Sequence, residues 1–241
     1  MKNQPSIIFE NSELVAVNKP SGWLSIPDRH DVEIPSIRTW LEKKYPEIFI
    51  IHRIDRETSG LLLFAKNEIA HKYYNQLFEK RQVKKIYLGL TLGSIAENSG
   101  TIAQPIEQHP SVLGKMRIGR NGKPSVTHFQ VLERLKGYSW VEFDLETGRT
   151  HQIRVHLQHI GHPLACDVLY GTADPLLLSS LKKKFKLSKE DEAERPLLHR
   201  LALHAYSIEM KTMAGELIKL EAPLSKDLEV VLIQLRKFAK V

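Results

Sequence analysis

The sequence predicts an α+β fold, in which a mixed, mainly antiparallel sheet carries flanking helices and loops. Residues 83–92 alternate apolar and polar side chains, which is the two-residue period of a strand with one buried face. Residues 125–132 and 138–145 alternate in the same way, and Lys136-Gly137 supplies the turn of a β-hairpin between them. Residues 68–78 instead repeat apolar side chains at helical spacing. The chain therefore combines sheet and helix patterns along one sequence.

The N-terminal part is predicted to form two short strands, 7–9 and 14–17, followed by a helix over residues 36–45. The segment Asn-Lys-Pro-Ser-Gly at residues 18–22 ends the second strand, because proline and glycine interrupt regular structure. Lys19 in this segment could contact a phosphate. A solvated side chain is the favoured interpretation.

Apolar residues 61–65 predict a buried strand, and Asn67 is expected to cap the helix after it. Residues 101–123 are polar, glycine-containing and basic, and predict long connections that either contact phosphate or are simply solvated. Residues 174–195 are interpreted as a surface excursion. The last elements expected are strands 197–210 and 216–221 and a closing helix from 228 to 238 with Ser225 as its cap.

The composition is that of a soluble globular protein, with 42% hydrophobic and 26% charged residues. Lysine and arginine number 35 against 28 aspartates and glutamates, so the formal net charge is +7. This balance suits a polyanionic partner such as nucleic acid, although many basic proteins bind none. The single cysteine, Cys166, allows neither an internal disulfide nor a CxxC zinc site and fits a reducing cytosol.

The domain organisation and location follow from what the sequence lacks. Residues 1–241 contain no internal repeat and no Gly/Ser-rich linker, so one domain is predicted. The N-terminus has no apolar run typical of a signal peptide, and no apolar run approaches membrane-spanning length. We therefore expect a cytoplasmic protein that does not associate with a membrane.

The most unusual stretch is His-Arg-Ile-Asp-Arg-Glu-Thr-Ser-Gly at residues 52–60, directly before the buried strand. It places Asp55 between Arg53 and Arg56, and the two guanidiniums favour the ionised carboxylate. The alternative is a solvated loop with a surface ion pair, and on these nine residues alone it is the favoured interpretation.

A second charged segment, residues 148–156, begins a predicted helix with Thr150 as its cap and Ile153 facing the core. Arg149 and Thr150 lie at the helix start, where anions are favoured. His151 and Arg154 are three residues apart and share one face.

Several common chemistries are excluded by spacing. The sequence has no P-loop, no GxSxG elbow, no cysteine-protease signature around Cys166 and no HExxH. His156, His159 and His162 are spaced by three, but Gly161 should end the helix first, so metal is disfavoured. What survives is a carboxylate that can attack carbon without any cofactor, as aspartates do in covalent catalysis.

Five segments, taken in order, resemble the RluA-type family of RNA pseudouridine synthases over nearly the whole chain. The second contains Asp55, and isoleucine stands there at position 54 in place of the family's leucine. The shared segments are residues 18–22, residues 52–60, Lys85-Ile86-Tyr87, residues 148–156 with the following Ile160 to Pro163, Asp167 and Tyr170-Gly171, and Leu203-His204-Ala205.

The resemblance implies a fold and a mechanism. The fold would be the pseudouridine synthase fold with a central basic cleft. Asp55 would be the catalytic aspartate, Tyr87 would contact the flipped uracil and take part in proton transfer, and Arg154 would pair with Asp55. Substrate binding would involve Arg53, His52, Thr58, Arg149, His151 and Gln152. Neither cofactor nor metal is implied, and the expected partner is RNA bound by a monomer.

The resemblance leaves the substrate open. No S4-type RNA-binding domain is expected before Ile7, which resembles single-domain members that act on tRNA, while rRNA stays an alternative. Residues 115–123 and 182–189 are candidate RNA contacts. Attack by Asp55 on the uracil ring and attack on the sugar are both open. A different class of function, a non-catalytic RNA-binding or RNA-folding protein with the same fold, is also retained.

Overall fold

The computed structural model describes residues 4–29, 31, 33–182, 184–187 and 193–238. It divides into two compact units, each made of two stretches of the chain. Unit 1 contains Met1–Tyr87 and His204–Leu224, and unit 2 contains Leu88–Leu203 and Ser225–Val241. That the two units act as the single predicted domain stays a prediction.

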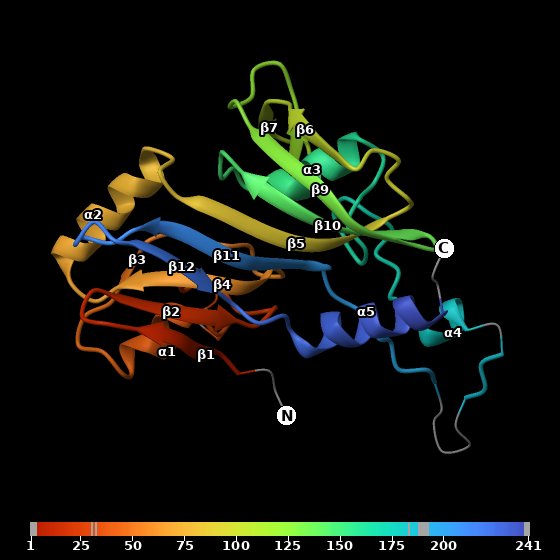
Figure 1. The fold of residues 1–241 in the computed structure, drawn as a ribbon, viewed down its shortest axis with the longest axis horizontal. Coiled ribbons are helices and arrows are strands. Elements are labelled where there is room, and N and C mark those ends of the chain that lie inside the picture. Colours follow the sequence, from red (N-terminus) through yellow and green to blue (C-terminus); the bar gives the residue numbers. More distant parts are fainter. Residues whose placement is uncertain (1–3, 30, 32, 183, 188–192, 239–241) are drawn as a thin grey trace. The chain divides into compact units, whose positions relative to one another are not determined.

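Unit 1 contains a mixed sheet, in which the strand order is β1-β2-β4-β11 (Figure 1). The β4 and β11 strands are parallel, with Ser59 opposite His204, whereas the other pairs in this unit are antiparallel. Short strands add to it, β3 beside β4 and β12 beside β11. The strands are β1 (Ser6–Glu10), β2 (Leu14–Lys19), β3 (Phe49–Ile50), β4 (Ser59–Ala65), β11 (Leu203–Lys211) and β12 (Leu217–Glu221).

Alternation along β4 gives this sheet two buried faces. Leu61 and Leu63 pack in one core cluster with residues of α2 (Glu68–Glu79), whereas Leu62 and Phe64 pack in another with residues of α1 (Ile37–Glu42). Both helices begin at side-chain caps. Ser36 accepts a hydrogen bond from the backbone N–H of Thr39, and the predicted cap Asn67 accepts one from that of Ala70. The buried strand and the Asn67 cap are therefore confirmed.

Unit 2 contains the strand order β5-β10-β9-β6. The predicted hairpin is confirmed as an antiparallel β9–β10 pair with a β-bulge between Trp140 and Val141. The segment 101–123 is not simply connecting loops: β6 pairs with β9, and β7 and β8 form a separate two-stranded sheet. The strands are β5 (Lys84–Leu92), β6 (Ser99–Ala103), β7 (Ile106–Gln108), β8 (Met116–Ile118), β9 (Val126–Leu135) and β10 (Tyr138–Leu145).

The described part of unit 2 also contains the helices α3 (Gln152–His159), α4 (Leu178–Leu181) and α5 (Lys226–Phe238). The expected cap Thr150 is wrong, because His151 occupies the N-cap position with a left-handed φ of 56° and makes no capping hydrogen bond. The closing helix α5 is tied to the chain by Arg200, whose guanidinium binds Asp227 at 2.7 and 2.6 Å. No helix within the described ranges is both long and apolar enough to cross a membrane.

Candidate active site

The Asp55 turn lies between β3 and β4 of unit 1. It is closed by a hydrogen bond of 3.1 Å from the Thr58 backbone N–H to the Asp55 carbonyl, which is the geometry of a β-turn. The preceding residue, Ile54, is buried and bonded on both its backbone groups to the hydroxyl of Ser25, at 3.0 and 3.2 Å. Asp55 is therefore presented on a turn whose backbone is fixed on both sides.

Lys19 holds this turn from within. Its side chain is completely buried, and its ammonium donates to the carbonyls of Pro20, Trp23 and Arg56 at 3.2, 2.7 and 2.9 Å. The solvated side chain expected from the sequence is wrong. The reason is that residues 18–22 fold back on the Asp55 turn, so that three backbone carbonyls point at one place. A group with several hydrogen-bond donors, such as an ammonium, can satisfy all three.

A methionine at position 19 tests this anchor, because it keeps most of the volume and removes every donor. We expect Lys19→Met to lower the free energy of unfolding by about 3 kcal/mol, since buried carbonyls without donors cost about 1–3 kcal/mol each. Urea denaturation measures the change. The matched control is Lys66→Met, which removes a partly exposed ion pair with Glu10 and one hydrogen bond to the Asn11 carbonyl, and should cost about 1 kcal/mol. Equal losses in the two variants would contradict the anchoring role of Lys19.

His52 lies inside unit 1 rather than in open solvent. Its Nε2 accepts a hydrogen bond of 3.1 Å from the Leu63 backbone N–H, and its ring stacks on Phe78 with centroids 4.9 Å apart. Burial lowers the pKa of His52 to about 3, with a smaller contribution from the nearby charge of Lys85. His52 is therefore a neutral acceptor that fixes the start of the Asp55 turn against β4.

Tyr87 is the last residue of the first stretch of unit 1, and the strand β5 on which it lies continues into unit 2 from Leu88. Tyr87 is electrostatically coupled to Asp55. Burial raises the pKa of the Tyr87 phenol well above its ordinary value, and the charge of Asp55 raises this pKa further. Tyr87 thus keeps its proton at neutral pH. The structure brings these two predicted residues into one electrostatic environment within one unit.

The residues that follow Asp55 attach the turn to β11. Gly60 has a φ of +111°, and a Cβ there would lie 2.2 Å from the Ala205 carbonyl oxygen, so only glycine fits. The Ser59 hydroxyl lies 2.9 Å from Nδ1 of the buried His204, whose Nε2 donates to the Ala222 carbonyl at 3.2 Å. The segment Leu203-His204-Ala205 therefore positions the turn.

Arg154 lies on α3 of unit 2 and is almost entirely buried. Its guanidinium makes two parallel hydrogen bonds of 2.8 Å to the carboxylate of Asp167, which is a bidentate ion pair. The same guanidinium lies 4.9 Å from the ring centroid of Tyr170. The Asp167 carboxylate also accepts hydrogen bonds from the backbone N–H groups of Leu169 and Tyr170. Arg154 is thus held rigidly, whereas its predicted pairing with Asp55, in the other unit, stays a prediction.

Two residues just before Arg154, the buried Gln152 and the half-buried His151, make side-chain hydrogen bonds to neighbouring elements. Gln152 is buried and uses its whole amide: Oε1 accepts from Thr147 and from the Arg149 backbone, and Nε2 donates to Val126 and Thr127. His151 Nδ1 lies 2.9 Å from the Tyr170 hydroxyl. These contacts orient α3, so the structure gives Gln152 an anchoring position, and its predicted role in substrate binding stays a prediction.

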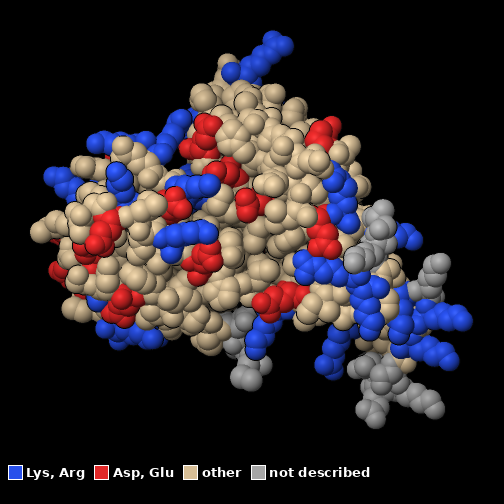
Figure 2. Space-filling model, viewed as in Figure 1, with Lys and Arg blue, Asp and Glu red and all other residues tan. Residues whose placement is uncertain are grey.

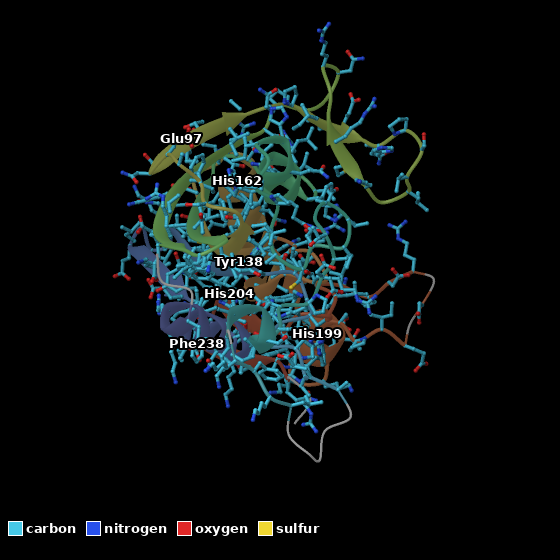
Figure 3. The ribbon with its side chains drawn as sticks, turned by 90° about the vertical axis from the view of Figure 1, so that its right-hand side faces the viewer. Glu97, Tyr138, His162, His199, His204 and Phe238 are labelled. Carbon is cyan, nitrogen blue, oxygen red and sulfur yellow. The ribbon has the colours of Figure 1, made fainter. Side chains whose placement is uncertain are left out.

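Histidines spaced by three do not converge. His156 is buried between Thr127 and the Gln104 carbonyl, and His162 binds the Leu92 carbonyl at 3.0 Å. Figure 3 shows His162 and His199 well apart within unit 2. Among the residues that the structure describes, no three His, Cys, Asp or Glu side chains could hold a metal ion together.

Lys19, Asp167, Tyr170 and His204 all lie in the shared segments, but the sequence predicts no role for Asp167, Tyr170 or His204. All four side chains carry polar groups and are buried. The residue types can be read from the sequence, but only the three-dimensional contacts show that these positions are buried. Of the predicted site residues, Arg53 is exposed, Thr58 is buried in the turn and Arg149 is half-buried at the start of α3.

Comparisons with known proteins agree with this arrangement. The profile of the family described as RNA pseudouridylate synthase matches residues 13–159. A curated relative, ribosomal large subunit pseudouridine synthase D of Nitrosomonas europaea, is 36% identical over 95% of this chain and 65% of that protein. The uncharacterized RNA pseudouridine synthase YhcT of Bacillus subtilis is 34% identical over 92% of this chain and 70% of its own length.

Solved structures give the same result for the fold. Human RNA pseudouridylate synthase domain containing 4 superposes with a TM-score of 0.72 at 27% identity, covering 95% of this chain and 92% of that one. Human RNA pseudouridylate synthase domain containing 1 gives a TM-score of 0.70 at 28% identity, covering 97% and 95%. These matches confirm the predicted α+β fold and the resemblance found in the five segments. The chain therefore belongs to the RNA pseudouridylate synthase family.

Proposed function

We propose that this chain isomerises a uridine of a structured RNA to pseudouridine, with Asp55 as the catalytic carboxylate. The observation that carries the proposal is the Asp55 turn of a family member: its backbone is fixed by Lys19 and Ser25, and its carboxylate shares an electrostatic environment with a protonated tyrosine. Fixed geometry of this kind lowers the cost of reaching a reactive arrangement.

The reaction needs no oxidant or reductant. The bond from uracil N1 to the sugar C1′ breaks, the base turns, and a new bond joins C5 to C1′, while the C5 proton is lost and N1 gains one. An aspartate can form the covalent intermediate that detaches the base, whether it attacks the ring or the sugar. Because Tyr87 keeps its proton at neutral pH, it suits contact with the base and proton donation rather than unaided proton removal.

The other residues would bind and orient. Arg154, fixed by Asp167, would pair with Asp55, and Arg53 would help to hold the RNA where the uridine leaves its stack. His52, Thr58, Arg149, His151 and Gln152 would support that contact. We further propose that the protein acts as a monomer in the cytoplasm.

Two RNA classes are candidates for the substrate. The sequence resemblance favours tRNA, whereas the Nitrosomonas europaea relative is named for the large ribosomal subunit. The chain spans only 65% of that relative, so its substrate does not transfer directly. Both classes therefore belong in one assay.

The test maps pseudouridines across total RNA from cells with and without the gene. We expect one or a few uridines to remain unmodified without it, and to be modified again when wild-type protein is supplied but not Asp55→Asn. Restoration by Asp55→Asn would overturn the catalytic role of Asp55. An unchanged map together with an equal growth effect of both proteins would favour the non-catalytic RNA-binding or RNA-folding function.

A basic surface on unit 2 is a candidate contact for the RNA backbone. Figure 2 shows lysines and arginines gathered at its right-hand side, over α4 and α5. Lys182, Lys184 and Lys186 are exposed in the chain after α4, while Lys183 and Lys189 of the predicted segment lie outside the described residues. Exposed cations of this kind bind phosphates and release counterions.

Replacing Lys182, Lys184 and Lys186 by alanine should weaken RNA binding and reduce the slope of log K against log salt by about 2, because each phosphate contact contributes about 0.7–0.9. Fluorescence anisotropy between low and moderate salt measures the slope. The control replaces three exposed lysines of unit 1, Lys72, Lys80 and Lys211. A slope equal to that of the wild type would reject the contact.

A further inference from the structure

A cavity of about 500 Å³ lies entirely within unit 2, between the β7–β8 sheet and the start of α3. We call it the hairpin cavity. Its volume is in the range of small-molecule sites in proteins. The lining residues are Ile106, Glu107 and Gln108 of β7, Met116 of β8, the loop Asn121 to Lys123, and Gly148 to Thr150.

The walls of the hairpin cavity are held in place by backbone hydrogen bonds and close packing. The loop after β8 folds back on β7, where Ile106 and Lys123 exchange two backbone hydrogen bonds of 3.0 and 2.8 Å. A Cβ on Gly122 would lie 2.6 Å from the Ile106 backbone, so this approach requires glycine. The Met116 backbone N–H donates to the Tyr170 hydroxyl at 2.8 Å, and Tyr170 packs in one core cluster with Val155 of α3.

The chemistry of the lining favours an anionic ligand with polar edges. Lys123 and Arg149 contribute two positive charges. The carboxylate of Glu107 accepts two hydrogen bonds from Arg117, at 2.9 and 2.7 Å, so its charge is balanced. Amide groups of Gln108 and Asn121 can both donate and accept hydrogen bonds.

An apolar surface is also present. Met116 is half-buried and presents this surface, whereas Ile106, which is only 2% exposed, packs in the core behind it. A nucleotide combines the features that these groups recognise, namely a phosphate, a flat apolar face and a polar edge. RNA-binding proteins read bases that have left their stack by stacking on aromatic rings or guanidinium planes and by hydrogen bonds to the base edges, and the amides of Gln108 and Asn121 can supply the edge contacts.

We propose that the hairpin cavity binds one nucleotide of the RNA substrate other than the isomerised uridine, so that it selects the substrate by a second base. The proposal rests on the proposed function of the chain. Arg149 and Lys123 hold the phosphate, Met116 lies against the base, and Gln108 and Asn121 contact its edge. Neither Asp55 nor Tyr87 lines the cavity, which is why the bound nucleotide is not the one that reacts.

The experiment compares RNA that lacks single bases with wild-type and altered protein. The RNA is the fragment carrying the uridine that the mapping assigns, synthesised with one abasic nucleotide at each position flanking that uridine. The proteins are the full chain, the double variant Asn121→Ala/Lys123→Ala, and the matched control Asn98→Ala/Lys136→Ala, which changes exposed residues of the same types outside the cavity.

With intact RNA, the double variant should raise Kd about tenfold and leave the single-turnover rate constant at saturation within about twofold. In wild-type protein, one abasic position should weaken binding about tenfold, and in the double variant the same position should weaken it less than about twofold. The control pair should behave as wild type. Asn121→Trp, which fills the cavity without removing a charge, should reproduce the loss of binding and of abasic sensitivity.

Equal abasic profiles in wild type and the double variant, or equal losses in the control pair, would overturn the proposal. Each binding measurement is repeated in an Asp55→Asn background. Turnover by Asp55→Asn would overturn the proposed catalytic role while leaving the comparison of abasic profiles intact, so the two failures are distinguishable.

Discussion

Asp55→Asn protein is expected to lose pseudouridine formation by roughly 10⁴-fold or more while its Kd for the RNA changes less than about threefold. An amide keeps the size of the carboxylate but cannot act as the nucleophile. The Asp55 backbone would still close the turn with Thr58 and stay anchored by Lys19. Single-turnover assays with labelled RNA give the rate constant, and anisotropy gives Kd.

Glu57→Gln is the matched control, because it makes the same change two residues away in the same turn. Glu57 accepts a hydrogen bond of 3.2 Å from the Ser21 hydroxyl, and glutamine can accept the same bond. Its turnover should stay within about threefold of the wild type. If Glu57→Gln and Asp55→Asn lost activity equally, the carboxylate of Asp55 would have no special role.

Gly60→Ala is expected to be the most destabilising single change in unit 1, with a loss of about 4 kcal/mol or more in the free energy of unfolding. The alanine Cβ would lie 2.2 Å from the Ala205 carbonyl oxygen and 2.8 Å from the Ala205 nitrogen, so β4 and β11 must separate. Urea denaturation measures the loss, and a reduced yield of soluble protein would accompany it.

The control for backbone conformation is Gly215→Ala in the turn between β11 and β12. Gly215 also has a positive φ, +84°, but a Cβ there would meet nothing within 4 Å. Its cost should therefore be about 1–2 kcal/mol, which is the left-handed strain alone. A Gly60→Ala loss no larger than this would show that the close approach to Ala205 relaxes without cost.

Local patterns predicted the elements that carry their own signal. Alternation identified β5 and the β9–β10 hairpin, and Asn67 marked the start of α2. The short strands β6, β7 and β8 were missed, because segments of three to five residues are too short to show a clear two-residue period and become strands through their pairing. His151 replaced Thr150 as the cap because contacts beyond the local sequence, including the one to Tyr170, set its conformation.

In the candidate site, too, sequence motifs predicted some residues, whereas contacts between distant residues had no signal in the sequence. Motif order predicted Asp55, Tyr87 and Arg154 as site residues, which stays a prediction, and it did not show that Asp167 holds Arg154 or that Lys19 is buried. The carboxylate of Asp167 follows Arg154 by 13 residues, across the end of α3 and a loop. Such a pairing has no local periodicity, and a lysine in a turn is ordinarily solvated.

The parallel pairing of β4 with β11 has a consequence for synthesis on the ribosome. Ser59 and its partner His204 are 145 residues apart in the chain. At about 5–20 residues per second, roughly 7–30 s pass between the emergence of the two strands. During this interval the Ser59–Gly60 end of β4 lacks its final neighbour, and an unpaired strand edge can pair with other chains. Nascent protein is therefore most exposed to misassociation after the Asp55 turn has been synthesised and before the segment Leu203-His204-Ala205 that supports it.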